Sequence, residues 1–81
     1  MHRENLVKMA NEISAFFQSE PNREAAVRAV ADHLRKFWDP RMRKQIIQHF
    51  QEGGIGLGDL ARDSIRLLAE ESASLPHCGD G

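Results

Sequence analysis

Several features that the chain lacks limit what it can be. Its only cysteine is Cys78, so it can form neither an internal disulfide framework nor a cysteine-based zinc site. No apolar run is long enough to cross a bilayer. Residues 1–8 pass from charged residues into a helical pattern, without the apolar core of a secretory signal. We therefore expect a soluble protein in the reducing cytoplasm, with no membrane partner.

Motifs for catalysis and cofactor binding are also missing. The glycine-rich segment Gly53–Gly58 lacks the preceding strand and the Gly-Lys-Ser/Thr of a phosphate loop, and Asp59 places a negative charge where a phosphate would bind. The sequence offers no histidine at a metal-ligand spacing, and His77-Cys78 alone supplies too few ligands. Four short helices also leave little room for a substrate pocket. We predict no catalytic, cofactor-binding or metal-binding residue in this chain.

The length of 81 residues fits a single domain. A chain of this size buries only about 60% of its unfolded surface, so its stability margin is thin. Without a disulfide or a metal, it depends on a well-packed core or on a partner.

What the sequence does contain is helical periodicity. Apolar residues recur every three or four positions in four segments, and no segment alternates as a strand would. Pro21 is expected to end the first helix near Ser19 and to open the second. Asp39-Pro40 supplies a capping residue and a favourable first position for the third helix. The sequence therefore predicts an all-α fold, a small bundle of four short helices.

Glycines and turn residues mark the later boundaries. The third helix is expected to end at Gly53-Gly54, after which Ile55 and Leu57 are expected to pack against the core. The fourth helix is expected to begin at Asp59 and end near Glu71. This gives one helical domain over residues 1–71 and a flexible tail over residues 72–81.

Positive charge is concentrated in residues 35–44, which hold five basic residues and only Asp39 to offset them, although the whole chain has a net charge of −1. Arg41, Arg43 and Lys44 fall in the first turn of the third helix, where the helix dipole disfavours a cation by about 0.3–1 kcal/mol. Two interpretations stay open: a solvated cationic face, or a docking patch for an acidic surface. The near-neutral net charge and the lack of a recognition motif make nucleic acid an improbable partner.

Two aromatic pairs, Phe16-Phe17 and Phe37-Trp38, each place neighbouring rings about 100° apart around a helix. A narrow core stripe would leave one ring of each pair at the surface, whereas a broad core would bury all four. An exposed aromatic ring beside arginines is typical of interface hot spots.

Specific segments resemble a known family. Leu6–Ile13 followed by Phe16-Phe17, and the string Val30–Arg43, resemble the delta subunit of NAD-dependent formate dehydrogenase. Gly53–Leu57 and the leucine-rich helix after it extend the resemblance, which covers roughly residues 6–68. Its most specific part runs from His33 to Met42.

The resemblance implies a cytoplasmic bacterial complex that oxidises formate to carbon dioxide and reduces NAD. In that family the large subunit carries a molybdenum or tungsten pterin and iron–sulfur clusters, and another subunit carries FMN and binds NAD. This chain would be a non-catalytic accessory subunit, without cofactors, that binds the large subunit and supports assembly or stability. The candidate partner-binding residues are Arg35, Phe37, Trp38, Pro40, Arg41, Arg43 and Lys44.

Three alternatives stay open at this point. The chain could be a transient assembly factor, or chaperone, for cofactor insertion. It could instead bind nucleic acid through residues 35–44. When isolated, it could also form a homodimer that covers the remaining aromatic rings.

Overall fold

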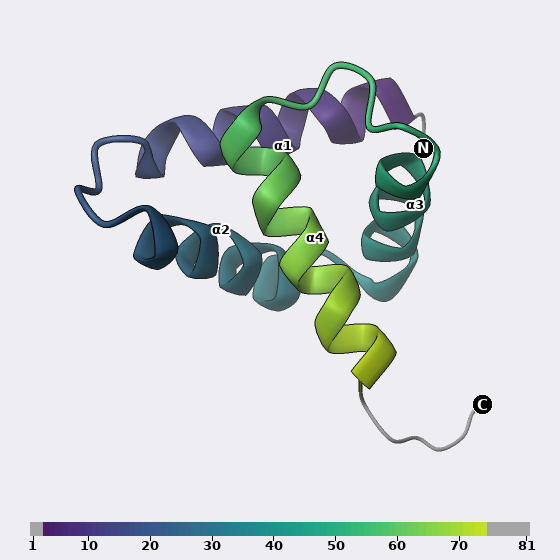
Figure 1. Ribbon diagram of the computed structural model, residues 1–81. Helices are drawn as coiled ribbons and strands as arrows, with labels where there is room; N and C mark the ends of the chain where they lie inside the picture. The colour runs from purple at the N-terminus through teal and green to yellow at the C-terminus, as the bar shows by residue number, and fades with distance from the viewer. Residues whose placement is uncertain (1–2, 75–81) are drawn as a thin grey trace.

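The computed structural model describes residues 3–74, which form four α-helices and no strand (Figure 1). The helices are α1 (Arg3–Phe17), α2 (Arg23–Phe37), α3 (Pro40–Gln51) and α4 (Asp59–Ser74). In Figure 1, α1 and α2 form a hairpin that closes at the left, α3 lies at the other end, and α4 runs diagonally across them. α4 contacts all three other helices, most extensively α2. The prediction of a small all-α bundle is confirmed.

Local capping signals explain where α2 and α3 begin. The Asn22 side chain accepts a hydrogen bond from the N–H of Ala25 (3.0 Å), so Asn22 caps α2 and Pro21 lies outside it. The prediction that Pro21 opens this helix is therefore wrong by two residues. Asp39 accepts from the N–H of Met42 (2.9 Å) and Pro40 follows as the first helical residue, as the sequence predicts.

The later boundaries differ slightly from expectation. α3 ends at Gln51, and Gly53 (φ 123°) and Gly54 (φ 65°) then reverse the chain with a backbone conformation that favours glycine. α4 continues to Ser74, beyond residue 71, where the sequence placed the end of the helical domain. Of the expected tail, residues 75–81 lie outside the described residues.

The core forms where α4 crosses the other helices. All four helices contribute large apolar side chains that are almost fully buried, namely Leu6, Val30, Leu34, Ile46, Ile65 and Leu68. Ser14 and Ser64 are also buried, and each hydroxyl donates to the carbonyl four residues earlier (2.8 and 2.7 Å), so neither loses its hydrogen bond on burial. No described helix is long and apolar enough to span a bilayer.

The loop between α3 and α4 buries only one of its two predicted apolar anchors. Leu57 lies in the core as predicted, with 7% of its surface exposed. Ile55, in contrast, is 79% exposed, so the prediction that it packs against the core is wrong. The positive φ of Gly56 (88°) turns the chain between the two residues and separates their directions.

A candidate partner-docking surface at the α2–α3 corner

The corner between α2 and α3 is fixed by its own backbone. The N–H of Trp38 donates to the carbonyl of Leu34 (3.0 Å) and closes α2, while Asp39 caps α3 immediately afterwards. The Trp38 side chain is only 4% exposed and belongs to the core. Trp38 was predicted to touch a partner, and its burial removes it from the surface.

The contacts of Arg43 explain why one of the cations lies at the start of α3, where the helix dipole disfavours it. Its Nη1 donates to the carbonyl oxygens of Arg35 and Trp38, both at 2.8 Å. Both carbonyls lie at the C-terminal end of α2, where helix carbonyls lack intrahelical donors and a positive charge is favourable. Arg43 therefore stabilises the end of α2, and its role in docking stays a prediction.

Arg35 is also engaged within the chain. It forms ion pairs with Asp32 of its own helix (3.0 Å) and with Glu71, and the second pair ties α2 to α4. Lys36 pairs with Asp32 as well (3.1 Å). These contacts neutralise the first half of the basic stretch, so Arg35 is a poor candidate for a partner's carboxylate.

Four of the predicted residues remain on an exposed surface, which we call the corner surface: Phe37, Pro40, Arg41 and Lys44. Phe37 is 72% exposed, and its ring leans on His33 with centroids 4.6 Å apart. Within residues 3–74, no carboxylate forms an ion pair with Arg41 or Lys44. The basic stretch is thus part structural and part available.

A small hollow of about 180 Å³ adjoins the corner surface and is lined by Asp39, Arg41, Met42 and Gln45. The Oε1 atom of Gln45 is buried and meets no hydrogen-bond donor among the described residues. A buried acceptor of this kind costs free energy until a donor reaches it. A partner's donor entering the hollow is one way to satisfy it.

The Phe16-Phe17 pair, like Phe37-Trp38, has one ring at the surface and one packed inward. Phe16 is 82% exposed, whereas Phe17 packs partly against the core. One ring of each pair is therefore left at the surface, which decides between the two predicted alternatives. Phe16 is the next-to-last residue of α1 and adjoins the α1–α2 loop, at the end of the hairpin away from the corner surface (Figure 1).

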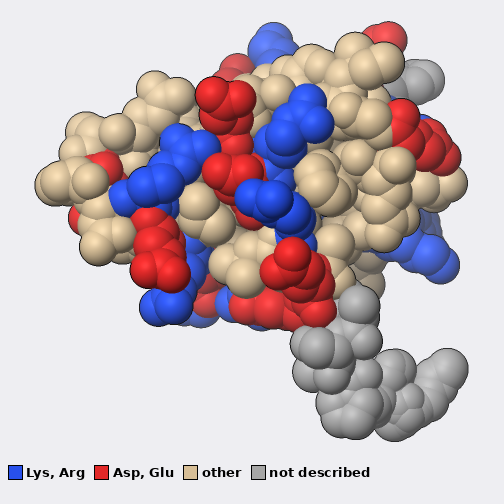
Figure 2. Space-filling view, viewed as in Figure 1, with Lys and Arg blue, Asp and Glu red and all other residues tan. Residues whose placement is uncertain are grey.

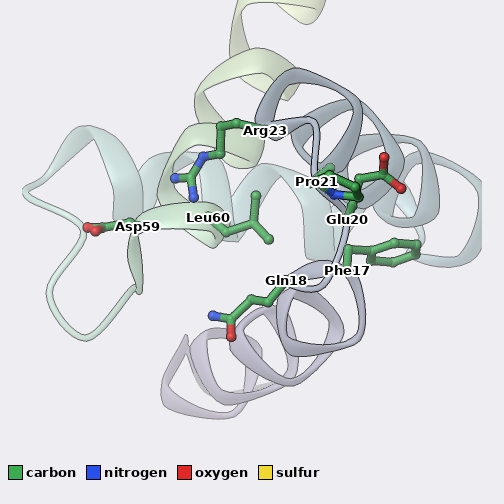
Figure 3. A pocket seen from close by; sticks show the side chains of 8 residues that line it. Phe17, Gln18, Glu20, Pro21, Arg23, Asp59 and Leu60 are labelled. Carbon is green, nitrogen blue, oxygen red and sulfur yellow. The ribbon is translucent and has the colours of Figure 1, made fainter.

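A larger hollow of about 430 Å³ lies between the α1–α2 loop and the start of α4 (Figure 3). Its charged groups do not converge: the carboxylates of Glu20 and Asp59 point away from each other, on opposite sides of Leu60. Arg23, which also lines it, is paired with Asp63 (2.9 Å). Among the described residues, no cluster of three His, Cys, Asp or Glu side chains is placed to hold a metal ion. This hollow presents no acid–base pair aimed at a common point.

Comparison with known proteins gives these features a context. Residues 5–65 match the family of the NADH-dependent formate dehydrogenase delta subunit FdsD. The chain belongs to this family. No curated protein and no solved structure matches it significantly.

The part matched to the delta-subunit family contains the features that shape the site. It runs from α1 into α4 and includes the corner surface, Arg43 and the α3–α4 loop. As a delta-subunit family member, the chain is a component of a formate dehydrogenase complex and associates with other subunits of that enzyme.

Proposed function

We propose that this chain is a non-catalytic accessory subunit of a cytoplasmic formate dehydrogenase and docks on the large, formate-oxidising subunit through the corner surface. The molybdenum or tungsten pterin, the iron–sulfur clusters, FMN and NAD are then held by other subunits. Docking supports the assembly or stability of the complex. The observation that carries the proposal is that Phe37, Arg41 and Lys44 are all exposed within eight residues of sequence at the turn from α2 to α3.

The composition of the corner surface fits a hot spot. Aromatic rings and arginines contribute most of the binding free energy at many protein interfaces. The corner is held in place by the Asp39 cap, the buried Trp38 and the hydrogen bonds from Arg43. A surface that is already ordered loses little conformational entropy on binding, so more of its contact free energy appears as affinity.

The positive charge of the corner surface supports the proposal that it binds an acidic patch on the partner. Elsewhere on the described surface many arginines face carboxylates of the chain itself, as Arg23 and Arg66 face Asp63 (both 2.9 Å). Figure 2 shows these red and blue groups side by side over α2 and α4. Arg41 and Lys44 have no such counter-charge within residues 3–74, so a partner's carboxylates would complement them. With Arg35, Lys36 and Arg43 engaged internally, a nucleic-acid interface has little support.

The test is co-purification of the chain with an affinity-tagged large subunit from cells that express the whole complex. Changing Arg41→Glu and Lys44→Glu together should lower the recovered delta subunit about 10-fold or more, because two attractive contacts become repulsive. Lys8→Glu with Arg28→Glu is the control, since it makes the same charge change at exposed positions of α1 and α2, where Lys8 forms no ion pair within residues 3–74 and Arg28 only a loose one with Glu24 (3.8 Å). Equal recovery of both double variants would contradict the proposal.

The same purification separates a permanent subunit from a transient assembly factor. A permanent subunit is recovered in a fixed ratio to the large subunit in the mature, active enzyme. An assembly factor is recovered with the cofactor-free large subunit and is lost from the active enzyme.

A further inference from the structure

The α3–α4 loop presents a single exposed apolar side chain on a segment that contains no charged residue of its own. Residues 53–58 consist of four glycines, Ile55 and Leu57, with Glu52 and Asp59 as the nearest charged residues in sequence. Leu57 turns into the core, while Ile55 is 79% exposed. The loop arches from α3 to α4 in Figure 1.

Asn11 of α1 clamps the second half of the loop. Its Nδ2 donates to the carbonyl of Gly56 and its Oδ1 accepts from the N–H of Gly58, both at 2.9 Å. The Asn11 side-chain amide therefore binds one carbonyl and one N–H of the loop backbone, and these groups are 45 and 47 residues away from it in sequence. At Gly56 a Cβ atom would lie 3.3 Å from Cγ1 of Val7, so the loop backbone is pressed closely onto α1.

Two further helices hold the first half. Nε2 of His49 (α3) lies 2.8 Å from the carbonyl oxygen of Ile55, to which it donates. The guanidinium of Arg62 (α4) donates to the carbonyls of Gly53 and Gly54, both at 3.3 Å. Three helices thus fix the backbone on both sides of Ile55.

The consequence is that the carbonyls of the loop, although not the N–H groups of Ile55 and Gly56, can be buried at low cost. Surface loops normally leave their carbonyls to water, and burying such groups without partners is expensive. Here the four successive carbonyls of residues 53–56 each accept a hydrogen bond from the protein itself. An apolar surface laid over this loop would therefore leave none of these four carbonyls unsatisfied.

We propose that Ile55 is a preorganised apolar knob that inserts into an uncharged, apolar pocket on another subunit of the formate dehydrogenase complex. This rests on the proposed docking of the chain to that complex, and it adds a second contact with different chemistry. The pocket is apolar because Ile55 is an apolar side chain, and a charged group buried directly against it would lose its hydration without compensation.

The position of the loop is continuous with the proposed interface. The corner surface lies at the N-terminal end of α3 and the loop follows its C-terminal end. A helix of 12 residues spans about 18 Å, which is within the width of an ordinary protein interface. The exposed side of α3 between them carries Lys44, Gln48 and Gln51. One partner surface can therefore contact both ends of α3.

The experiment measures the affinity of the full-length chain for the complex lacking its delta subunit, by biolayer interferometry. Ile55→Asp should weaken binding about 10-fold or more, as expected for the centre of a hot spot. Phe16→Asp is the matched control, because Phe16 is as exposed as Ile55 but lies at the far end of α1, and it should stay within about twofold. Neither change should alter the thermal unfolding midpoint, since both side chains are exposed.

Hydrogen exchange supplies a second readout that does not depend on substitution. Within residues 3–74, the N–H groups of Ile55 and Gly56 have no hydrogen-bond acceptor, so both should exchange rapidly in the isolated chain. Both should be protected in the complex, because docking excludes water from the loop.

Asn11→Ala should weaken binding although Ile55 is intact, because the clamp on the loop is lost.

The outcomes separate the two proposals. If the wild-type chain does not bind the complex, the proposed function fails. If the wild-type chain binds and Ile55→Asp binds equally well with unprotected loop amides, the knob is wrong and the corner surface is unaffected. If Ile55→Asp only converts a homodimer of the isolated chain into monomers, the loop joins two copies and the inference is overturned.

Discussion

Two arginines in the same turn of α3 should affect stability in opposite directions. Arg41 and Arg43 both lie in the first turn of α3, and a sequence-based electrostatic argument treats them alike. In the structure the Arg43 side chain donates to two carbonyls at the end of α2, whereas the Arg41 side chain forms no ion pair or hydrogen bond with any residue of 3–74. We therefore predict that Arg43→Met destabilises the fold and that Arg41→Met stabilises it slightly.

The magnitudes follow from the contacts. A hydrogen bond from a charged donor contributes roughly 1.5–3 kcal/mol when well shielded, and the Arg43 bonds lie in a partly exposed position, so the pair together should be worth about 1–2 kcal/mol. Removing a cation from the first turn of a helix gains about 0.3–1 kcal/mol at low salt. Methionine has a helix propensity close to that of arginine, so the backbone contributes little to either difference.

Thermal unfolding followed by far-UV circular dichroism measures both effects. For a domain of this size 1 kcal/mol shifts the midpoint by about 4–8 °C. Both variants lose a cation from the first turn of α3, so the midpoint of Arg43→Met should lie roughly 4–16 °C below that of Arg41→Met. Arg41→Met should raise the midpoint by about 1–8 °C at low ionic strength, and the gain should shrink in salt. If both variants shift the midpoint in the same direction, the capping role assigned to Arg43 is wrong.

Two further predictions concern the core and the surface. Trp38→Ala should lower the free energy of unfolding by about 3–5 kcal/mol, which is a large part of the stability of a small domain. The variant should therefore unfold at a much lower urea concentration than the wild-type protein. Trp38→Phe should retain most of the stability. Hydrogen bonding from Arg3 lowers the pKa of Glu52 below its ordinary value of 4.5, so Arg3→Met should raise this pKa again in a carboxyl NMR titration. Because the pKa is lowered on folding, the Glu52 contribution is complete above pH 4.5 and is lost as the pH falls through the lowered value. An unchanged Glu52 pKa in the Arg3 variant would contradict this.

Local signals predicted the elements of the fold better than their boundaries. The Asp39-Pro40 pair fixed the start of α3 because a cap and its proline act within one turn of the chain. At Pro21 two local preferences competed, and the capping side chain of Asn22 prevailed over a proline in the first turn. Ile55 was misplaced because an apolar residue among glycines gives no sign of its direction, which the positive φ values of the loop decide.

The site was predictable as a region but not residue by residue. The sequence indicated residues 35–44 through charge and aromatic content, and five of the seven candidates are exposed, although Arg35 among them is paired within the chain. The structural roles of Arg35 and Arg43 depend on tertiary contacts: Glu71 is 36 residues from Arg35, and the carbonyls bound by Arg43 belong to another helix. The clamp around Ile55 gave no sequence signal, because Asn11, His49 and Arg62 come from three different helices.

Stability and docking should therefore be linked in this chain. A domain of 81 residues has a thin stability margin, and here Phe16, Phe37 and Ile55 stay outside the core instead of adding to it. A partner that binds only the folded chain adds stability by mass action, about 2.7 kcal/mol at a partner concentration 100 times Kd. Variants that weaken docking without touching the core, such as Ile55→Asp, should leave the isolated chain unchanged and remove this added stability in the complex. A loss of stability in the complex but not in the isolated chain distinguishes an exposed side chain that binds the partner from one that is exposed without contacting it.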